Sequence, residues 1–160
     1  MRDNFAHLMS DYSFITQWWL DAPIDAVWKA IQESERWPDW WKSVADVRVI
    51  SSGDERGVGA IRRFTWRGRL PYTLTFDMRV TKIEPPILLE GIASGDLAGQ
   101  GRWRLAPEDS GTAVRYDWNV RANKFWMRLF APILRPVFSW NHDAVMKNGE
   151  IGLRRLLGIR

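Results

Sequence analysis

Residues 14–31, FITQWWLDAPIDAVWKAI, change their hydrophobic period part-way along. Up to Leu20 the stretch is rich in β-branched and aromatic residues, which favour a strand. After Asp21 the apolar residues recur at helical spacing, and Pro23 suits the first position of a helix. One face of the strand would carry Phe14, Thr16, Trp18 and Leu20, and one face of the helix Ile24, Val27, Trp28 and Ile31. The stretch therefore predicts a strand, beginning near Tyr12, that runs directly into a helix.

Three tryptophans follow within five residues, in the segment ERWPDWWKSV (residues 35–44). The segment predicts a short second helix or a turn. Trp37 and Trp41 are four residues apart, so on a helical turn they share one face, with Trp40 beside them. Such rings either fill the core or form the wall of a ligand cavity. We favour the core for Trp37 and keep both interpretations open for Trp40 and Trp41.

From Val44 to Arg121 the hydrophobic period becomes two residues. Turn signals such as SSGDERG and PEDSGT divide this region into about six strands. In TLTFDMRV (residues 73–80), for example, apolar and polar residues alternate, and the apolar set is Leu74, Phe76, Met78 and Val80. This alternation is typical of an antiparallel sheet with one covered face and one face in water.

The C-terminal segment contains the only other long helical pattern, and we expect it to cover the sheet. Pro132 and Pro136 should start or kink this helix. Asp143 falls on the polar face, where it would pair with Lys147 one turn away. The face toward the sheet would carry Leu134, Phe138, Asn141, Val145, Asn148, Gly149, Gly152 and Leu156.

The composition fits one globular domain. The chain has 160 residues, of which 46% are hydrophobic and 26% charged, and both values are near the average for globular proteins. Its 11 tryptophans are unusual, and so many indole rings in one core suggest wide spaces between the elements. We expect a single domain over residues 1–160, in which residues 1–11 form a flexible lead.

The chain has no cysteine, which excludes a disulfide framework, a thiol nucleophile and a Cys-type zinc site. The sequence also shows neither the apolar stretch of a signal peptide nor an apolar run of membrane-spanning length. We therefore expect a soluble, cytoplasmic protein, present as a monomer or a homodimer. The net charge of +4 permits contact with anionic partners without requiring it.

Three segments, FITQWWLDAPIDAVWKAI, ERWPDWW and PVFSWNHDAVMKNGEIGLRRLL, together resemble the START-like, or SRPBCC, superfamily and most of all its polyketide cyclase/dehydrase branch. The resemblance extends from Tyr12 to Leu157. It implies an α+β helix-grip fold, in which a curved antiparallel sheet of about seven strands wraps around a long C-terminal helix, with two short helices after the first strand. It also implies an apolar cavity that takes a hydrophobic ligand, but no particular reaction.

Inward-facing residues of the expected elements would line this cavity. Strict alternation turns Arg62 inward, so it must pair with an acid or reach a ligand oxygen, unless it extends to water at the strand end. The phenol of Tyr116 would bond either a ligand carbonyl or a protein group. The expected lining is Trp18, Trp40, Trp41, Arg62, Phe64, Trp66, Phe76, Met78, Trp103, Tyr116, Trp118, Phe138, Asn141 and Val145.

Two polar residues of the long helix are the candidates for catalysis. Asn141 lies near the middle of the apolar face, where an unpaired amide would cost about 1–3 kcal/mol, so it should bond a strand, a water or a ligand oxygen. His142 lies at the edge of the same face, and its usual pKa of about 6.5 would suit proton transfer at neutral pH. The alternative for His142 is a structural hydrogen bond to a strand.

Other kinds of site find no support in the sequence. Two distant histidines offer no metal-ligand spacing, and no glycine-rich phosphate loop precedes a helix, so we expect neither a metal nor a cofactor. The glycines of SGDLAGQG are interpreted as turn and bulge residues of a hairpin. Arginines on the polar sheet face would pair across strands with acids such as Asp77 and Asp117. These arginines are Arg79, Arg102, Arg104 and Arg115. Because the tryptophans lie on the other face, we expect no nucleic-acid partner.

The first interpretation is therefore a protein that binds a hydrophobic small molecule, such as an aromatic polyketide, a lipid or an isoprenoid. In one version it is a polyketide cyclase or dehydratase, which would act by holding a poly-β-ketone in one conformation and polarising a carbonyl. The rival is a carrier without turnover. A third interpretation is a membrane-associated module, in which KFWMRLFAPILRPVF places Phe125, Trp126 and Phe130 in a lipid interface.

Overall fold

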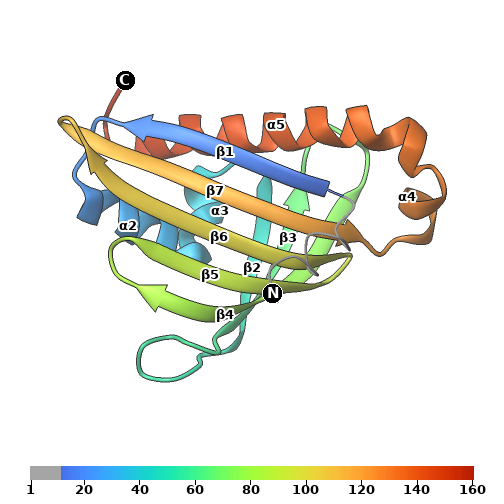
Figure 1. The fold of residues 1–160 in the computed structure, drawn as a ribbon, viewed down its shortest axis with the longest axis horizontal. Helices are drawn as coiled ribbons and strands as arrows, with labels where there is room; N and C mark the ends of the chain where they lie inside the picture. The colour runs from blue at the N-terminus through green and yellow to red at the C-terminus, as the bar shows by residue number, and fades with distance from the viewer. Residues whose placement is uncertain (1–11) are drawn as a thin grey trace, which may run out of the picture.

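The computed structural model describes residues 12–160 of the chain (Figure 1). Seven antiparallel strands form one sheet in the order β1-β7-β6-β5-β4-β3-β2, so the first and last strands of the chain lie side by side. The strands are β1 (Tyr12–Leu20), β2 (Val44–Ser51), β3 (Ile61–Arg67), β4 (Thr73–Glu84), β5 (Leu88–Gly95), β6 (Leu97–Glu108) and β7 (Gly111–Ala122). The expectation for residues 1–11 falls outside the described residues.

Short helical elements follow β1, and a short and a long helix follow β7. They are α2 (Ile24–Gln32), the 3-10 turn η1 (Ser34–Arg36), α3 (Trp37–Trp40), α4 (Phe125–Leu129) and α5 (Ala131–Leu156). Pro23 immediately precedes α2, Pro132 lies in the first turn of α5, and Pro136 lies inside α5. Over residues 12–160, no helix combines the length and the apolar character needed to cross a bilayer.

Figure 1 shows α5 running along one side of the strongly curved sheet, with α2 near one end of this helix and α4 at the other. The strands turn their largest apolar side chains toward the helices. On β6 and β7, for example, Trp103, Leu105, Val114, Trp118 and Val120 are buried. The predicted α+β helix-grip fold of about seven antiparallel strands and a long C-terminal helix is therefore confirmed.

The glycines of β6 do not form the predicted bulge. Gly99 and Gly101 pair with both neighbouring strands in an unbroken register. Gly101 lies opposite Trp118, and a Cβ at this position would lie 2.8 Å from the phenol oxygen of Tyr116 and 3.1 Å from the Trp118 ring. The glycine is therefore needed to make room for aromatic side chains of the next strand.

A close contact joins α3 to the middle of α5. Trp41 is almost fully buried, and its indole Nε1 donates a 2.8 Å hydrogen bond to the carbonyl oxygen of Val145. A Cβ at Gly149 would fall on the Trp41 indole, and a Cβ at Gly152 would fall on the carbonyl oxygen of Trp40. Two glycines three residues apart therefore let α5 approach the tryptophan segment to backbone contact.

The buried stripe of α5 differs from the predicted face. Met146 and Leu153 are buried, whereas Leu156, the last helical residue, is 48% exposed. At this end α5 is bonded to β1, since Arg154 donates a 2.7 Å hydrogen bond to the carbonyl oxygen of Trp19.

The pairing expected between Asp143 and Lys147 is also wrong. Lys147 instead pairs with Glu150 at 3.0 Å, and Arg154 holds the other carboxylate oxygen of Glu150 at 3.1 Å. These two cations together lower the pKa of Glu150, although its partial burial acts in the opposite direction.

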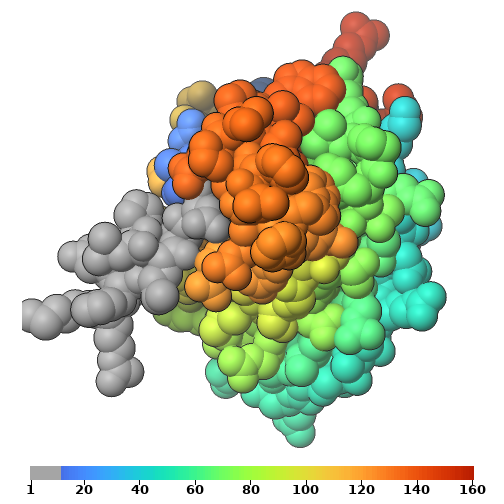
Figure 2. All heavy atoms as spheres, turned by 90° about the vertical axis from the view of Figure 1, so that its right-hand side faces the viewer, coloured from blue at the N-terminus to red at the C-terminus, as the bar shows by residue number. Residues whose placement is uncertain are grey.

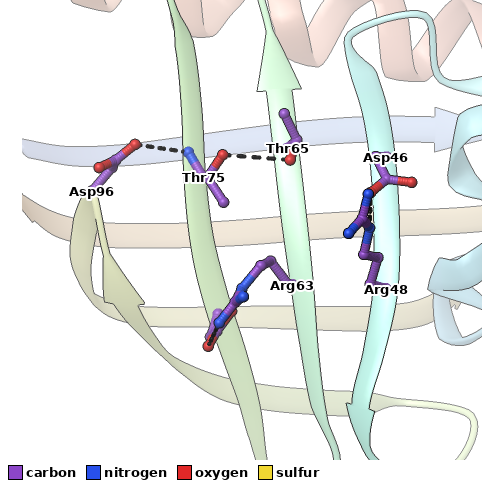
Figure 3. A network of polar contacts seen from close by, with 7 residues as sticks. Asp46, Arg48, Arg63, Thr65, Thr75 and Asp96 are labelled. Carbon is purple, nitrogen blue, oxygen red and sulfur yellow. Dashed lines mark hydrogen bonds and ion pairs between the residues drawn. The ribbon is translucent and has the colours of Figure 1, made fainter.

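Polar side chains pair on the outer face of the sheet (Figure 3). Asp77 has a cross-strand partner, as predicted for this face, and the partner is Arg63 at 2.8 Å. Asp117 instead pairs with Arg115, two residues away on its own strand, at 2.9 Å. These exposed pairs contribute little individually to the free energy of unfolding, and they leave the inner face of the sheet to apolar groups.

Replacement of Gly149 by alanine should lower the free energy of unfolding by about 2 kcal/mol. The added methyl group collides with the Trp41 indole, and overpacking of this kind costs more than the helix gains from alanine. Urea unfolding followed by circular dichroism measures the effect. Asp143→Ala, an exposed change on the same helix, should shift the value by less than about 0.5 kcal/mol. Equal stabilities of the two variants would contradict the proposed role of Gly149.

Candidate functional site

Two mainly apolar cavities lie between the sheet and the helices, each with a volume of about 120 Å³. We call them cavity 1, which extends along α5 toward α4, and cavity 2, which extends toward the η1 turn and the β4–β5 side of the sheet. The residues that border cavity 1 are Tyr12, Phe14, Trp37, Trp41, Trp66, Gly68, Tyr72, Leu74, Phe76, Leu97, Trp103, Tyr116, Trp118, Val120, Met127, Phe138, Asn141, His142, Val145 and Met146. Those that border cavity 2 are Ile31, Gln32, Ser34, Trp37, Arg56, Gly57, Arg62, Phe64, Trp66, Phe76, Met78, Val80, Ile83, Leu89, Glu90, Gly91, Gly101, Trp103 and Tyr116.

The same five aromatic residues border both cavities, and we call them the aromatic partition: Trp37, Trp66, Phe76, Trp103 and Tyr116. The rings contact one another. Trp103 and Tyr116 stack with centroids 4.1 Å apart, and Trp66 and Phe76 are nearly parallel at 6.5 Å. The two cavities are therefore neighbouring lobes of one interior space, separated by aromatic side chains.

Strand register explains how distant parts of the chain assemble this partition. Trp103 on β6 pairs directly with Tyr116 on β7, and Phe76 on β4 pairs with Phe64 on β3. Trp37 comes from α3, where its indole Nε1 donates a 3.1 Å hydrogen bond to the carbonyl oxygen of Ala30. Four strands and one short helix thus contribute to the same wall.

Asn141 borders cavity 1 and is bonded to the loop between β3 and β4. Its Oδ1 accepts a 2.9 Å hydrogen bond from the backbone N–H of Arg69. Gly68 makes this contact possible, because a Cβ there would fall on the Asn141 amide. The amide oxygen of Asn141 therefore has a structural partner, as the sequence analysis required, and it holds the loop against α5.

His142 also borders cavity 1 and stacks on Phe14 of β1, with ring centroids 4.0 Å apart. Its Nε2 is buried and has no hydrogen-bond partner among the residues that the structure describes. Burial lowers the pKa of His142 to about 4. The expectation of an ionisation near neutral pH at this residue is therefore wrong, because an apolar environment disfavours the charged imidazolium.

Two of the three charged residues that border cavity 2 are ion-paired. Arg62 does turn inward, and its guanidinium bonds the carboxylate of Glu35 through Nε and Nη2, both at 2.9 Å. Glu90 also borders cavity 2, and it pairs with Arg102 at 2.6 Å. The third charged residue, Arg56, forms no ion pair among the described residues, but it is exposed to water.

Two further polar groups belong to the aromatic partition. The Nε1 of Trp66 is buried and has no hydrogen-bond partner within residues 12–160. Burial raises the pKa of the Tyr116 phenol, which therefore stays protonated at physiological pH. At the far end of cavity 1, burial and the neighbouring Tyr12 raise the pKa of Tyr72 to about 12. The interior thus presents neutral hydrogen-bonding groups.

Most residues of the predicted lining border one of the two cavities. They are Trp41, Arg62, Phe64, Trp66, Phe76, Met78, Trp103, Tyr116, Trp118, Phe138, Asn141 and Val145, together with the catalytic candidate His142. Trp18 and Trp40 do not. Trp18 is buried behind Trp41 and Trp103, with ring centroids 5.9 and 5.7 Å away. Trp40 is half-buried and stacks on the outer side of Trp41 at 5.4 Å.

Sequence reasoning did not predict Trp37, Tyr72 and Met127 as residues of the cavity wall. The sequence pattern favours the core for Trp37, but this residue belongs to the aromatic partition. Tyr72 lies in the irregular segment before β4, and Met127 lies in α4, a helix of only five residues. No hydrophobic period extends over such short segments. The concentration of aromatic residues in LPYT and KFWM is the signal that was available.

His142 should make stability depend on pH between about 6.5 and about 4. Folding lowers the pKa of His142, so the folded state keeps its full stability at pH values above the pKa of the unfolded chain. This stability is lost as the pH falls through the window. Below the pKa of His142 in the folded state, the free energy of unfolding changes no further from this cause. The loss amounts to about 3 kcal/mol. His142→Gln should remove this part of the dependence, which urea unfolding across the window measures. A variant with the same pH dependence as the parent would show that His142 titrates normally.

Comparison with known proteins agrees with this geometry. A search of curated sequences found no significant match. Among solved structures, TTHA0849 from Thermus thermophilus is similar, with a TM-score of 0.73 and 14% identity over 91% of this chain and 99% of that one. A START superfamily protein from Mycobacterium smegmatis has a TM-score of 0.73 and 11% identity, over 90% and 98% of the two chains. The Zhui aromatase/cyclase from Streptomyces sp. R1128 has a TM-score of 0.65 and 16% identity, over 91% and 95%. The family model described as polyketide cyclase / dehydrase and lipid transport matches residues 17–149, so the chain belongs to this family.

Proposed function

We propose that this protein binds a compact, ring-containing hydrophobic molecule with a few oxygen atoms inside cavities 1 and 2. The observation that carries the proposal is the aromatic partition, which turns five large rings toward both lobes. Aromatic side chains supply a large apolar contact area at defined orientations, which suits flat ligands. Family membership supports the same class of ligand.

The size of each lobe favours a ring-sized fragment. Each lobe measures about 120 Å³, and an engineered apolar cavity of about 150 Å³ is known to bind benzene. A ligand of two or more rings would therefore place one part in each lobe and pass beside the aromatic partition. Aromatic polyketides and cyclic isoprenoids have this shape, and a long unbranched acyl chain fits it less well.

The polar groups of the interior favour neutral oxygens on the ligand. The Trp66 indole N–H and the protonated Tyr116 phenol are available as donors toward carbonyl groups. His142 is uncharged at neutral pH and is able to accept a hydrogen bond from a ligand hydroxyl or donate one to a ligand carbonyl. For a free carboxylate on the ligand, Arg62 is already paired with Glu35, and the other arginine that borders cavity 2, Arg56, is exposed to water. We therefore propose phenols and ketones rather than acids.

Binding without turnover is the favoured version of this proposal. A histidine with a pKa of about 4 is a weak base at pH 7, and Asn141 is already bonded to the backbone of Arg69. Cyclisation or dehydration of a poly-β-ketone is the second candidate. It is supported by the family and by the Tyr116 phenol, whose position in the partition suits polarisation of a ligand carbonyl.

The neutral dye N-phenyl-1-naphthylamine should show saturable binding and quench tryptophan emission. The reason is that a dye molecule in the cavities would lie against the five rings of the aromatic partition. Val145→Phe, which fills cavity 1, should weaken binding roughly tenfold. Ile151→Phe adds the same ring to an exposed position on the same helix and should leave affinity unchanged. Fluorescence titration of the three proteins gives the dissociation constants. Binding that does not saturate, with the fold intact by circular dichroism, would count against an internal site.

Binding of a poly-β-ketone analogue should depend on Tyr116 while product formation stays at the uncatalysed rate. Tyr116→Phe removes the phenolic hydroxyl and with it one hydrogen bond to the ligand. Binding of a carbonyl ligand should therefore weaken roughly tenfold. The same change should leave N-phenyl-1-naphthylamine binding nearly unaltered, because that dye has no carbonyl. Chromatography of the mixture after incubation detects product. Accelerated product formation that His142→Gln abolishes would establish the cyclase instead.

A further inference from the structure

One end of the molecule exposes an unusual amount of apolar surface. Of the fifteen large apolar side chains that are exposed among the described residues, seven fall within residues 125–140. We call six of them the α4–α5 face, which leaves out Trp126 and consists of Phe125, Leu129, Phe130, Ile133, Val137 and Trp140. Figure 2 views the molecule from this end, where the orange atoms of α4 and the start of α5 form a broad projecting surface.

These side chains point away from the core. Phe125 is 78% exposed and Ile133 is 76% exposed, whereas Met127 and Phe138 on the same two helices are buried. Ile133, Val137 and Trp140 follow one another at helical spacing, so they form one stripe on the outer side of α5. The segment therefore has two apolar sides, one against the cavity and one in water, and an apolar patch of this kind marks an interaction surface.

The segment that carries the face has only positive charges, although Asp96 lies beside it and pairs with Lys124 at 3.6 Å. Residues 118–142 contain four of the 23 basic residues of the chain and none of its 19 acidic residues, so this segment accounts for the net charge of +4. Arg128 and Arg135 lie within it, and Arg69 from the β3–β4 loop lies over the Trp140 ring at 5.4 Å. Among the residues that the structure describes, none of these three arginines forms an ion pair with a carboxylate.

This combination fits an anionic lipid surface better than a second copy of the chain. In a symmetric dimer the same face meets itself, which would bring the unpaired arginines of both copies together. In a bilayer, tryptophan and phenylalanine occupy the boundary between headgroups and acyl chains, while arginines reach the phosphates. Each basic residue near an anionic leaflet adds to the affinity.

We propose that the α4–α5 face docks on membranes that contain anionic lipids. Phe125, Leu129 and Ile133 enter the boundary of the acyl region, and Arg69, Arg128 and Arg135 contact lipid phosphates. The protein lies on the bilayer and does not span it, because the apolar contact comes from the outer sides of one short helix and the start of α5.

Docking places one end of cavity 1 at the membrane. Met127, which borders cavity 1, belongs to the same short helix as Phe125 and Leu129. Trp126 packs edge-on against two wall residues of cavity 1, with its ring centroid 5.2 Å from that of Tyr72 and 6.3 Å from that of Phe138. A hydrophobic ligand therefore has a short route between the bilayer and the cavity at α4. This second step rests on the proposed function, whereas docking itself does not.

Flotation with vesicles tests docking with the full-length protein. We expect it to bind vesicles made of equal parts phosphatidylcholine and phosphatidylglycerol, more weakly at high salt, and much less to phosphatidylcholine alone. Phe125→Ser combined with Ile133→Ser should weaken binding roughly tenfold or more, and Arg128→Glu should weaken it roughly tenfold. No binding to the anionic vesicles would overturn the proposal.

Matched substitutions outside the α4–α5 face control for a general loss of exposed apolar area or of positive charge. Ile50 and Ile87 are 50% and 48% exposed and lie outside the face, so Ile50→Ser combined with Ile87→Ser should bind vesicles like the parent. Arg79→Glu changes the net charge as Arg128→Glu does, but on the sheet. Equal losses for the control and face variants would overturn the proposal. So would a dimer, seen by sedimentation without lipid, that Phe125→Ser with Ile133→Ser dissociates, because the face would then belong to a second copy.

Transfer of N-phenyl-1-naphthylamine separates docking from ligand binding. The face variants should bind the free dye in buffer like the parent, but take it up from preloaded anionic vesicles several-fold more slowly. If no protein binds the free dye, the proposed function fails while flotation still decides docking. If the face variants lose flotation but take up dye at the parent rate, the route through α4 is refuted.

Discussion

The contact between Trp41 and α5 sets the distance between the sheet and its covering helix. The indole N–H bonds the carbonyl oxygen of Val145, a group that in a regular helix also accepts the backbone N–H of Gly149. Because Gly149 has no side chain, the Trp41 ring fits against the helix at this point. The carbonyl oxygen of Val145 can then accept both the indole N–H and the backbone N–H of Gly149. With α3 wedged between the sheet and α5, the remaining space on either side of the tryptophan cluster becomes the interior that a ligand is proposed to occupy.

That interior is apolar but not featureless. Apart from Arg56, which is exposed to water, its ionisable groups are held in their neutral forms, as for His142 and Tyr116, or are paired at the edge, as for Arg62 and Glu35. A buried charge without a partner would be costly in such a space, and the fold avoids one at every ionisable position described above. Such a lining selects ligands by shape and by a few hydrogen bonds, and it offers little driving force for proton transfer.

The sequence predicted what depends on regular periodicity. Alternation along the strands correctly turned Phe76, Trp103 and Trp118 inward, and the wheel of the long helix brought Asn141 and Val145 to the cavity. Periodicity could not predict that the tryptophan segment lies so close to α5 that Trp40 is left outside and Trp37 is drawn inside. Nor could it predict the low pKa of His142, which comes from burial; the Phe14 ring that packs on His142 comes from more than 100 residues earlier in the chain.

Gly101 has a consequence for how this protein's ligand preference can change over evolutionary time. It lies in the middle of β6 with regular pairing on both sides, and the space its side chain would occupy is taken by the Tyr116 phenol and the Trp118 ring. One added methyl group would displace the ring of Tyr116, which borders both lobes, and would crowd Trp118, which borders cavity 1. Selectivity is therefore adjustable from the backbone side of the sheet, through the position of the Tyr116 phenol.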